Sequence, residues 1–161
     1  MRTLRRILCA VDLEKSSEQA FDRALSLAVI ADARLFLLHA TPAKVPFSTR
    51  ARERLLYLAQ LRERAREAGV KVRVEEQHGD PASLIVLHAN SRKVDIVVLG
   101  SNRRRGRRRF KEGSVSERVL RRAEWPVLIV PWDAQAGMLK KKQAGASSRR
   151  VSQHESRRAS D

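Results

Sequence analysis

Residues 7–11 read Ile-Leu-Cys-Ala-Val, and Asp12 follows them at once. A continuous apolar run of this length is typical of a strand buried on both faces of a parallel sheet. Residues 16–31 then place apolar side chains at helical spacing, which predicts a helix that packs on the sheet. Ser16 and Gln19 predict a capping box at its start. A buried strand followed directly by such a helix is the repeating unit of open α/β folds.

The same alternation continues along the chain. Further strands are expected at residues 35–40, 70–74, 94–99 and 127–130, and further helices at residues 50–68, 80–87 and 114–123. Residues 70–74 alternate with a period of two, which indicates an edge or half-exposed strand. The order predicts an α/β fold with an open five-stranded parallel sheet, helices on both faces and right-handed crossovers.

Local signals mark where these helices begin and end. Asp80 followed by Pro81 predicts a capped helix start, and Ser114 with Glu117 predicts a second capping box. Gly69 stands where a left-handed residue is expected at the end of the second helix. The apolar stripe expected on that helix is Ala51, Leu55, Leu58, Ala59 and Ala65.

Positive charge is concentrated in two segments. Lys and Arg number 34 against 18 Asp and Glu, a net charge of +16, and 12 of these charges lie in two places. From Arg103 to Lys111 there are seven basic residues and no acidic residue. Residues 134–161 carry a net +5 and almost no large apolar residue, so we expect a disordered basic tail after an α/β domain at residues 1–133. Such charge favours contact with nucleic acid or an acidic partner.

Several classes of protein are not expected. Cys9 is the one cysteine, so no internal disulfide forms, and it is expected to be a packed thiol. The four histidines show no metal-ligand spacing, and His39 is interpreted as structural, although near the ligand. No phosphate-loop or nucleophile-elbow motif occurs, so we expect no catalytic residues and no enzyme. No apolar run is long enough for a signal peptide or membrane span, which favours a cytoplasmic protein.

Two strand ends are candidates for the functional site, because ligands of open parallel sheets bind outside the carboxyl ends of the strands. The first is Asp12, which is expected to accept hydrogen bonds from a ribose or a base. The second is the connection at residues 99–115, where Gly100 is expected to allow close approach of a ligand. Gly113 and Ser114 open a helix whose N-terminus attracts anions, and the Ser114 hydroxyl is expected to cap that helix or to bind phosphate.

These segments together resemble the universal stress protein family. The resemblance covers about residues 4–131 and is carried by three stretches, ILCAVDLEKSSEQAFDRAL, LFLLHATP and VVLGSNRRRGRRRFKEGSVSERVLRRAEWPVLIVP. It implies a flavodoxin-like strand order 3-2-1-4-5. It also implies a homodimer formed through the last strand, from Val127 to Val130.

The resemblance further implies an adenine-nucleotide site. The family's ATP-binding members share a glycine pattern that Gly100, Gly113 and Ser114 match, whereas Arg103 replaces the second glycine. An arginine there either strains the backbone or supplies a bidentate phosphate ligand. The nucleotide-binding residues implied are Ala10, Val11, Asp12, Ala40, Leu99, Gly100, Arg103, Gly113, Ser114 and Val115.

Three functions follow from this reading of the sequence. The first is a universal-stress-type protein that binds ATP, AMP or another anion in a stress-signalling or regulatory role, with Mg²⁺ expected only together with a nucleotide. The alternative is a dimeric interaction module without nucleotide, which contacts nucleic acid or an acidic partner through the segment from Arg103 to Lys111 and through the tail. A third, an enzyme of a related nucleotide-binding fold, is supported by fold analogy alone.

Overall fold

The computed structural model describes residues 3–46, 48–101 and 114–131, and strands and helices alternate along them as expected. Residues 134–161, for which a tail is predicted, lie outside this part of the chain, as does the segment from Arg103 to Lys111. The elements are β1 (Arg6–Val11), α1 (Lys15–Ala31), β2 (Arg34–Thr41), α2 (Ala51–Glu67), β3 (Val72–His78), α3 (Pro81–Arg92), β4 (Ile96–Ser101), α4 (Val115–Leu120) and β5 (Val127–Pro131).

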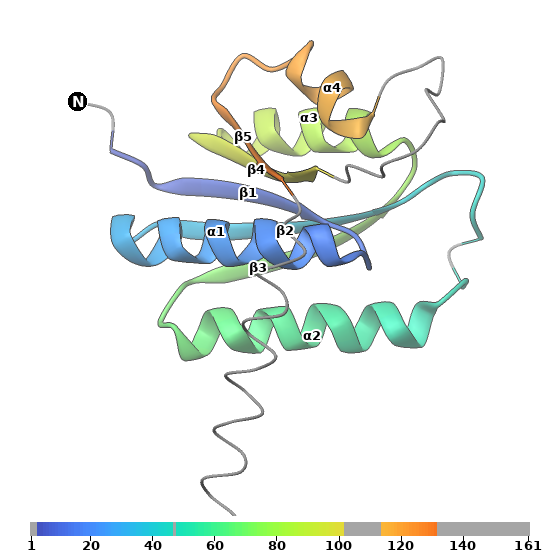
Figure 1. Ribbon diagram of the computed structural model, residues 1–161, viewed down its shortest axis with the longest axis horizontal. Helices are drawn as coiled ribbons and strands as arrows, with labels where there is room; N and C mark the ends of the chain where they lie inside the picture. Colours follow the sequence, from blue (N-terminus) through green and yellow to red (C-terminus); the bar gives the residue numbers. More distant parts are fainter. Residues whose placement is uncertain (1–2, 47, 102–113, 132–161) are drawn as a thin grey trace, which may run out of the picture.

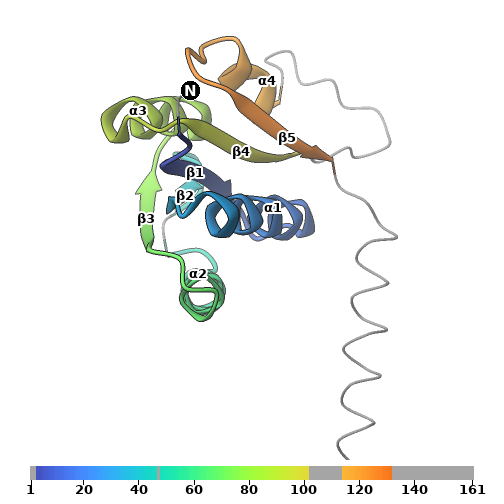
Figure 2. The same ribbon diagram turned by 90° about the vertical axis from the view of Figure 1, so that its left-hand side faces the viewer.

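All five strands pair in parallel in the order β3-β2-β1-β4-β5. This confirms the predicted sheet and the order 3-2-1-4-5. β3 is an edge strand, as its alternating sequence indicated, and β5 forms the opposite edge (Figure 2). The central position of β1 brings the carboxyl ends of β1, β2 and β4 next to one another.

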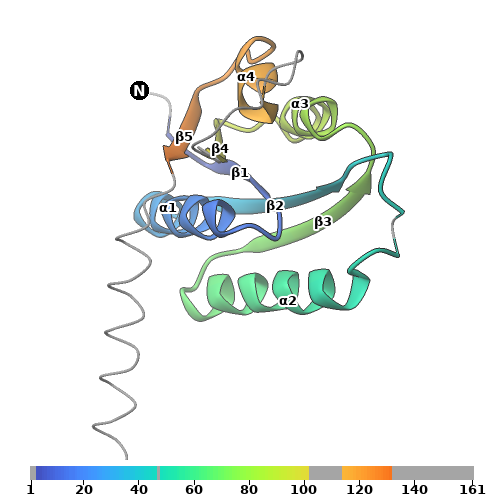
Figure 3. The ribbon, with the colours of Figure 1, turned by 45° about the vertical axis from the view of Figure 1, so that its right-hand side comes forward.

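The helices form two layers, with α1 and α2 on one face of the sheet and α3 and α4 on the other (Figures 1 and 3). Consecutive residues of β2 point to opposite faces because a strand is pleated. Leu35 and Leu37 therefore pack with α1 and α2, whereas Phe36 and Leu38 pack with α3 and α4. This alternation continues to the end of β2, where it determines the chemistry of the site.

The first helix starts differently from the expectation. Glu14 is the N-cap of α1 and makes no side-chain capping hydrogen bond, so the predicted Ser16–Gln19 capping box is wrong. Ser16 already lies inside the first turn, where it is buried against Gly100. The Asp12 carboxylate accepts hydrogen bonds from the Glu14 N–H and the Ser17 hydroxyl, which fixes the turn before α1.

The buried face of α2 is also turned relative to the expected stripe. Leu58 and Ala65 are buried as predicted, but Leu55 is 64% exposed and Ala59 is exposed as well. The other buried positions are Arg54 and Leu61. Arg54 takes the inward position in place of Leu55 because a carboxylate on β3 is there to pair with it.

The remaining helix-end predictions are confirmed. Gly69 has a φ of 74° just beyond α2. The Asp80 carboxylate accepts a hydrogen bond from the Ser83 N–H at 2.9 Å, with Pro81 at the first helical position. Ser114 and Glu117 form the complete capping box of α4.

Candidate functional site

A cavity of about 470 Å³ opens at the carboxyl ends of β1, β2 and β4. Its lining comes from these strands and from the first residues of all four helices or the loops before them. Seven of the residues predicted for the nucleotide site line it, namely Ala10, Val11, Asp12, Ala40, Leu99, Gly100 and Val115. The cavity therefore lies at the edge of the sheet where the sequence predicts a site.

The other three predicted residues do not contribute to this lining. Ser114 is described but does not line the cavity, because its hydroxyl accepts the Glu117 N–H at 3.2 Å and caps α4. Its own N–H donates to the Glu117 carboxylate at 3.1 Å. Arg103 and Gly113 lie outside the described residues.

One side of the cavity, the apolar wall, is built from short strand ends and the start of two helices. It continues the smaller of the two cores, because Leu38, Ile85 and Leu99 belong to the buried cluster under α3 and α4. An apolar surface of this kind suits an apolar part of a ligand, which loses little hydration on entering it. The apolar wall consists of Ala10, Leu38, Ala40, Pro81, Ile85, Leu99 and Val115.

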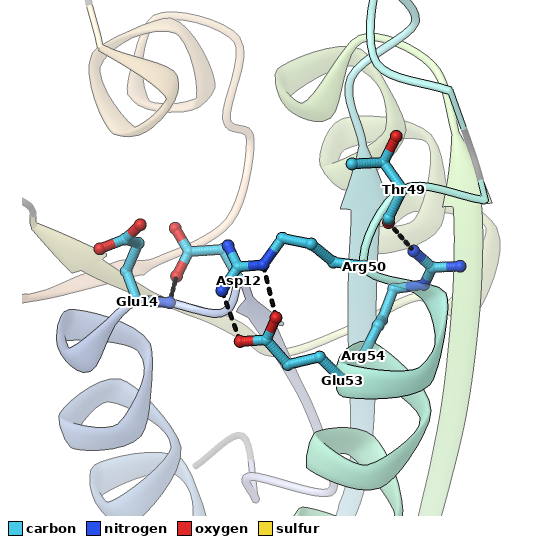
Figure 4. A network of polar contacts seen from close by, with 6 residues as sticks. All are labelled: Asp12, Glu14, Thr49, Arg50, Glu53 and Arg54. Atoms are coloured by element: carbon cyan, nitrogen blue, oxygen red, sulfur yellow. Dashed lines mark hydrogen bonds and ion pairs between the residues drawn. The ribbon is translucent and has the colours of Figure 1, made fainter.

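The opposite side, the polar wall, consists of Asp12, His39, Thr41, Arg50 and Arg54. His39 and Thr41 come from β2, between and after the residues that β2 gives to the apolar wall. Arg50 and Arg54 come from the N-cap and the first turn of α2. Figure 4 shows Asp12 and Arg50 approaching each other, whereas Arg54 lies beside Thr49.

Asp12 is fixed by the turn between β1 and α1. Its Oδ1 accepts the Glu14 N–H at 2.9 Å and the Ser17 hydroxyl, while the Ser17 oxygen accepts the Asp12 N–H at 2.8 Å. In the described part of the chain no hydrogen bond is recorded for Oδ2, and the residue is exposed. Asp12 can therefore accept hydrogen bonds from a hydroxyl or amino group of a ligand.

His39 is buried, at 6% exposure, and its Nδ1 lies 2.9 Å from the Val11 carbonyl oxygen. A carbonyl only accepts, so Nδ1 carries the hydrogen, and a neutral ring keeps a lone pair on Nε2. Burial lowers the pKa of His39 and outweighs the hydrogen bond to Val11, which raises it. The positive charge of Arg54 lowers the pKa further, and the charges of Glu76 and Asp12 raise it by less. His39 is thus held as a neutral acceptor.

Arg54 is almost completely buried, at 4% exposure. Its Nε lies 2.7 Å from Glu76 Oε2, and its Nη1 donates to the Thr49 carbonyl oxygen at 3.2 Å. The guanidinium therefore connects α2 to β3 and to the loop before α2.

Arg50 reaches from the start of α2 toward the β1–α1 turn (Figure 4). It has a φ of 54°, in the left-handed region, and it pairs with Glu53. The hydrogen bond to Glu53 raises the pKa of Arg50, with a further increase from the charge of Glu14 across the mouth. The rim of the cavity therefore carries both signs of charge, from Asp12 and Glu14 on one side and Arg50 on the other.

Thr41 is 4% exposed, and its Oγ1 is buried without a hydrogen-bond partner among the described residues. Sequence reasoning did not select Thr41, Arg50 or Arg54. Only the position of Thr41, directly after a predicted buried strand, was available as a signal. Nothing in the sequence indicated that Arg54 is turned inward.

Gly100 lines the cavity, but its contact with Ser16 is what requires a glycine at this position. A Cβ at this position would lie 2.7 Å from the Ser16 carbonyl oxygen. The close approach is therefore that of the first turn of α1, rather than that of a ligand as the sequence suggested.

Two kinds of feature are absent from the described residues. No group of three or more His, Cys, Asp or Glu is placed to hold a metal ion. No helix in this part of the chain combines the length and the apolar character that crossing a membrane requires.

The strand order and the cavity at the strands' carboxyl ends define an open α/β protein of flavodoxin-like topology with a cavity at the switch between β1 and β4. The model of the universal stress protein family matches residues 3–131. The chain belongs to that family.

Sequence relatives that are universal stress proteins agree with this assignment. The universal stress protein YxiE of Bacillus subtilis is 30% identical over 144 residues, which span 78% of this chain and 97% of the relative. A universal stress protein of Methanocaldococcus jannaschii is 41% identical over 73 residues, but these cover 45% of this chain and only 43% of that relative.

Solved structures share the fold. A universal stress protein in complex with cAMP has a TM-score of 0.68 and 26% identity, covering 82% of this chain and 100% of that one. A member of the family from Burkholderia pseudomallei has a TM-score of 0.67 and 26% identity, and the match covers 81% of this chain and 98% of that one.

Proposed function

We propose that this protein binds an adenine nucleotide, ATP or AMP, in the cavity at the carboxyl ends of β1, β2 and β4, and that it acts as a regulatory binding protein rather than an enzyme. The observation that carries the proposal is the pairing of an apolar wall with the accepting carboxylate of Asp12 in a cavity of about 470 Å³. The cAMP complex of a structurally similar relative supports an adenine-containing ligand.

In this proposal each part of the nucleotide meets matching chemistry. The base lies against the apolar wall, and the ribose hydroxyls donate to Asp12 Oδ2. The phosphates lie toward the opening, whose rim carries the positive charge of Arg50. Mg²⁺ enters only as a companion of the phosphates.

Isothermal titration of the full chain with AMP and ATP tests the proposal. We expect dissociation constants in the micromolar range. Asp12→Asn keeps an oxygen for the Glu14 N–H but removes the charge, so we expect binding to weaken by about tenfold. Asp32→Asn, at the far end of α1, is the matched control and should bind as the wild type does. No heat at millimolar nucleotide would contradict the proposal.

A second candidate function rests on the distribution of charge. Of the net +16, 12 charges lie between Arg103 and Lys111 and in residues 134–161. In this version the protein forms a homodimer through β5, from Val127 to Val130, and holds nucleic acid or an acidic protein.

Binding of a fluorescent single-stranded oligonucleotide at increasing salt tests this candidate, because affinity for a polyanion falls steeply with salt when phosphates are contacted. Removing residues 134–161 should reduce that slope. An unchanged slope would exclude the tail as the contact, and sedimentation of the full chain would report whether it dimerises.

A further inference from the structure

The amino ends of the strands, at the edge of the sheet opposite the cavity, carry a row of basic residues. Arg6 begins β1 and Arg34 begins β2, and the two are register partners on neighbouring strands. Lys71 continues the row, because its carbonyl accepts the Leu35 N–H at 2.9 Å directly before β3 begins. All three basic residues, the amino-edge row, are exposed. This edge lies on the left of Figure 1, where the chain begins.

Arg6 and Arg34 belong to the face of the sheet that α3 and α4 cover. Leu8 and Phe36 follow them by two residues and are members of the buried cluster on that face. The Arg6 guanidinium also donates from Nη1 to the carbonyl oxygen of Arg92, the last residue of α3, at 3.1 Å. The amino-edge row therefore lies where α3 ends and no longer covers the sheet.

Beside the row, two more arginines share one carboxylate. Glu75 of β3 accepts the Nε of Arg73 at 2.8 Å and pairs with Arg92 through its same oxygen. Its other oxygen lies 2.7 Å from His88 Nδ1. The Arg73 side chain is 60% exposed, whereas that of Glu75 is 12% exposed. One buried acidic group therefore serves two arginines, and positive charge remains in excess at the surface.

The row itself lacks an acidic partner. No ion pair is recorded for Arg6, Arg34 or Lys71 within the described part of the chain. Asp95 lies next to Arg6 on the β4 side, but its Oδ2 accepts the backbone N–H groups of Arg5 and Arg6 at 2.8 and 2.9 Å. Like charges directly opposite each other on neighbouring strands destabilise a sheet. An anion bound along the row would relieve that repulsion.

We infer that the amino-edge row, together with Arg73 and Arg92, binds the phosphate backbone of a double-stranded nucleic acid. Neighbouring strands are about 4.8 Å apart, so the charges stand in line along the sheet edge. Guanidinium groups bind phosphate oxygens in a bidentate manner. The set contains no aromatic side chain on which an unpaired base could stack, and no apolar side chain that a lipid surface would take up.

This surface is separate from the cavity and does not depend on the proposed function. It also differs from the contacts of the second candidate function, which are assigned to the segment from Arg103 to Lys111 and to the tail. Phosphate contacts carry no sequence information, so binding should be independent of sequence.

Fluorescence anisotropy of a labelled DNA duplex of about 20 base pairs, titrated with the full chain at several salt concentrations, tests the inference. Combining Arg34→Gln with Lys71→Gln removes two phosphate contacts. The slope of log affinity against log salt should therefore become shallower by about 1.8. The swap of Arg34→Lys with Lys71→Arg keeps both charges and should bind as the wild type does.

The matched control removes the same charge from another surface. Arg52 and Arg62 are exposed on α2, and no ion pair is recorded for either within the described residues. Combining Arg52→Gln with Arg62→Gln should leave the slope unchanged. Urea denaturation of the variants shows whether each is folded, and the midpoint without Arg34 and Lys71 should be no lower than that of the wild type, because repulsion is removed.

Three results would overturn the inference. The first is an equal change of slope in the two double glutamine variants, because only net charge would then matter. The second is an unchanged slope without Arg34 and Lys71. The third is a loss of binding to anionic phospholipid vesicles but not to the duplex, which would make the partner a membrane surface. Titration of the same variant with AMP should match the wild type, so failure here leaves the proposed function intact.

Discussion

The two walls of the cavity are built by the same strand but differ in chemistry. Leu38 and Ala40 of β2 face α3 and contribute to the apolar wall, whereas His39 and Thr41 face α2 and contribute to the polar wall. The pleat of one strand therefore sorts the four residues into two surfaces. A shift of register by one residue would exchange the walls.

The walls also differ in how they are stabilised. The apolar wall continues a buried core, so packing alone maintains it. The polar wall needs a partner for each buried group, and His39 and Arg54 have one. Thr41 Oγ1 has none among the described residues. The polar wall is thus the more costly surface to form, which is the expected character of a site adapted to a ligand.

The largest effect is expected where the β4 side of the cavity touches α1. Gly100→Ala places a Cβ 2.7 Å from the Ser16 carbonyl oxygen, and backbone must move to accept it. We expect unfolding free energy to fall by about 2–3 kcal/mol. Gly69→Ala adds the same atom in open space at a φ of 74° and should cost only about 1 kcal/mol. Urea denaturation measures both, and a smaller loss for Gly100→Ala would contradict the close contact.

The next effect concerns the ion pair behind the polar wall. Arg54→Met leaves Glu76 without its buried partner, and because the Glu76 side chain is 30% exposed, we expect a loss of only about 2 kcal/mol. Arg50→Met is the matched control, since both side chains of its pair with Glu53 are about half exposed and solvent screens their attraction, so its loss should be clearly smaller. Equal losses in urea denaturation would show that burial does not distinguish the two arginines.

A smaller effect of opposite sign is expected at Thr41. Thr41→Val keeps the shape of the side chain and removes a buried hydroxyl without a partner, so the protein should become more stable by about 1 kcal/mol. A loss of stability in the same denaturation assay would indicate that Thr41 Oγ1 already has a partner.

The smallest effect is a dependence of stability on pH. Folding lowers the pKa of His39 below its ordinary value of 6.5, so in acid the unfolded chain binds this proton more readily than the folded one. Stability contributed by the neutral ring is complete above pH 6.5 and is lost as the pH falls toward the lowered pKa. In urea denaturation, the free energy of unfolding should fall less between pH 7.5 and 5.5 in His39→Gln than in the wild type. An equal fall in both proteins would contradict the lowered pKa of His39.

The fold was predictable because it depends on periodic features. The apolar runs and capping residues gave the order of elements, and the family resemblance gave the strand order and seven residues that line the cavity. The polar wall was not predictable. Whether Arg54 or Leu55 faces inward depends on Glu76, 22 residues further along the chain, and no local pattern carries that information. The reason for Gly100 was missed likewise, since Ser16 lies far from it in the sequence.

Amide chemical shifts of the isotope-labelled protein during titration with AMP test most directly whether a nucleotide lies between the two walls. The account predicts that the amides of Asp12, Ala40, Thr41 and Ile85 shift together and saturate with one dissociation constant. Shifts confined to residues outside the cavity, or no shifts at millimolar AMP, would contradict it.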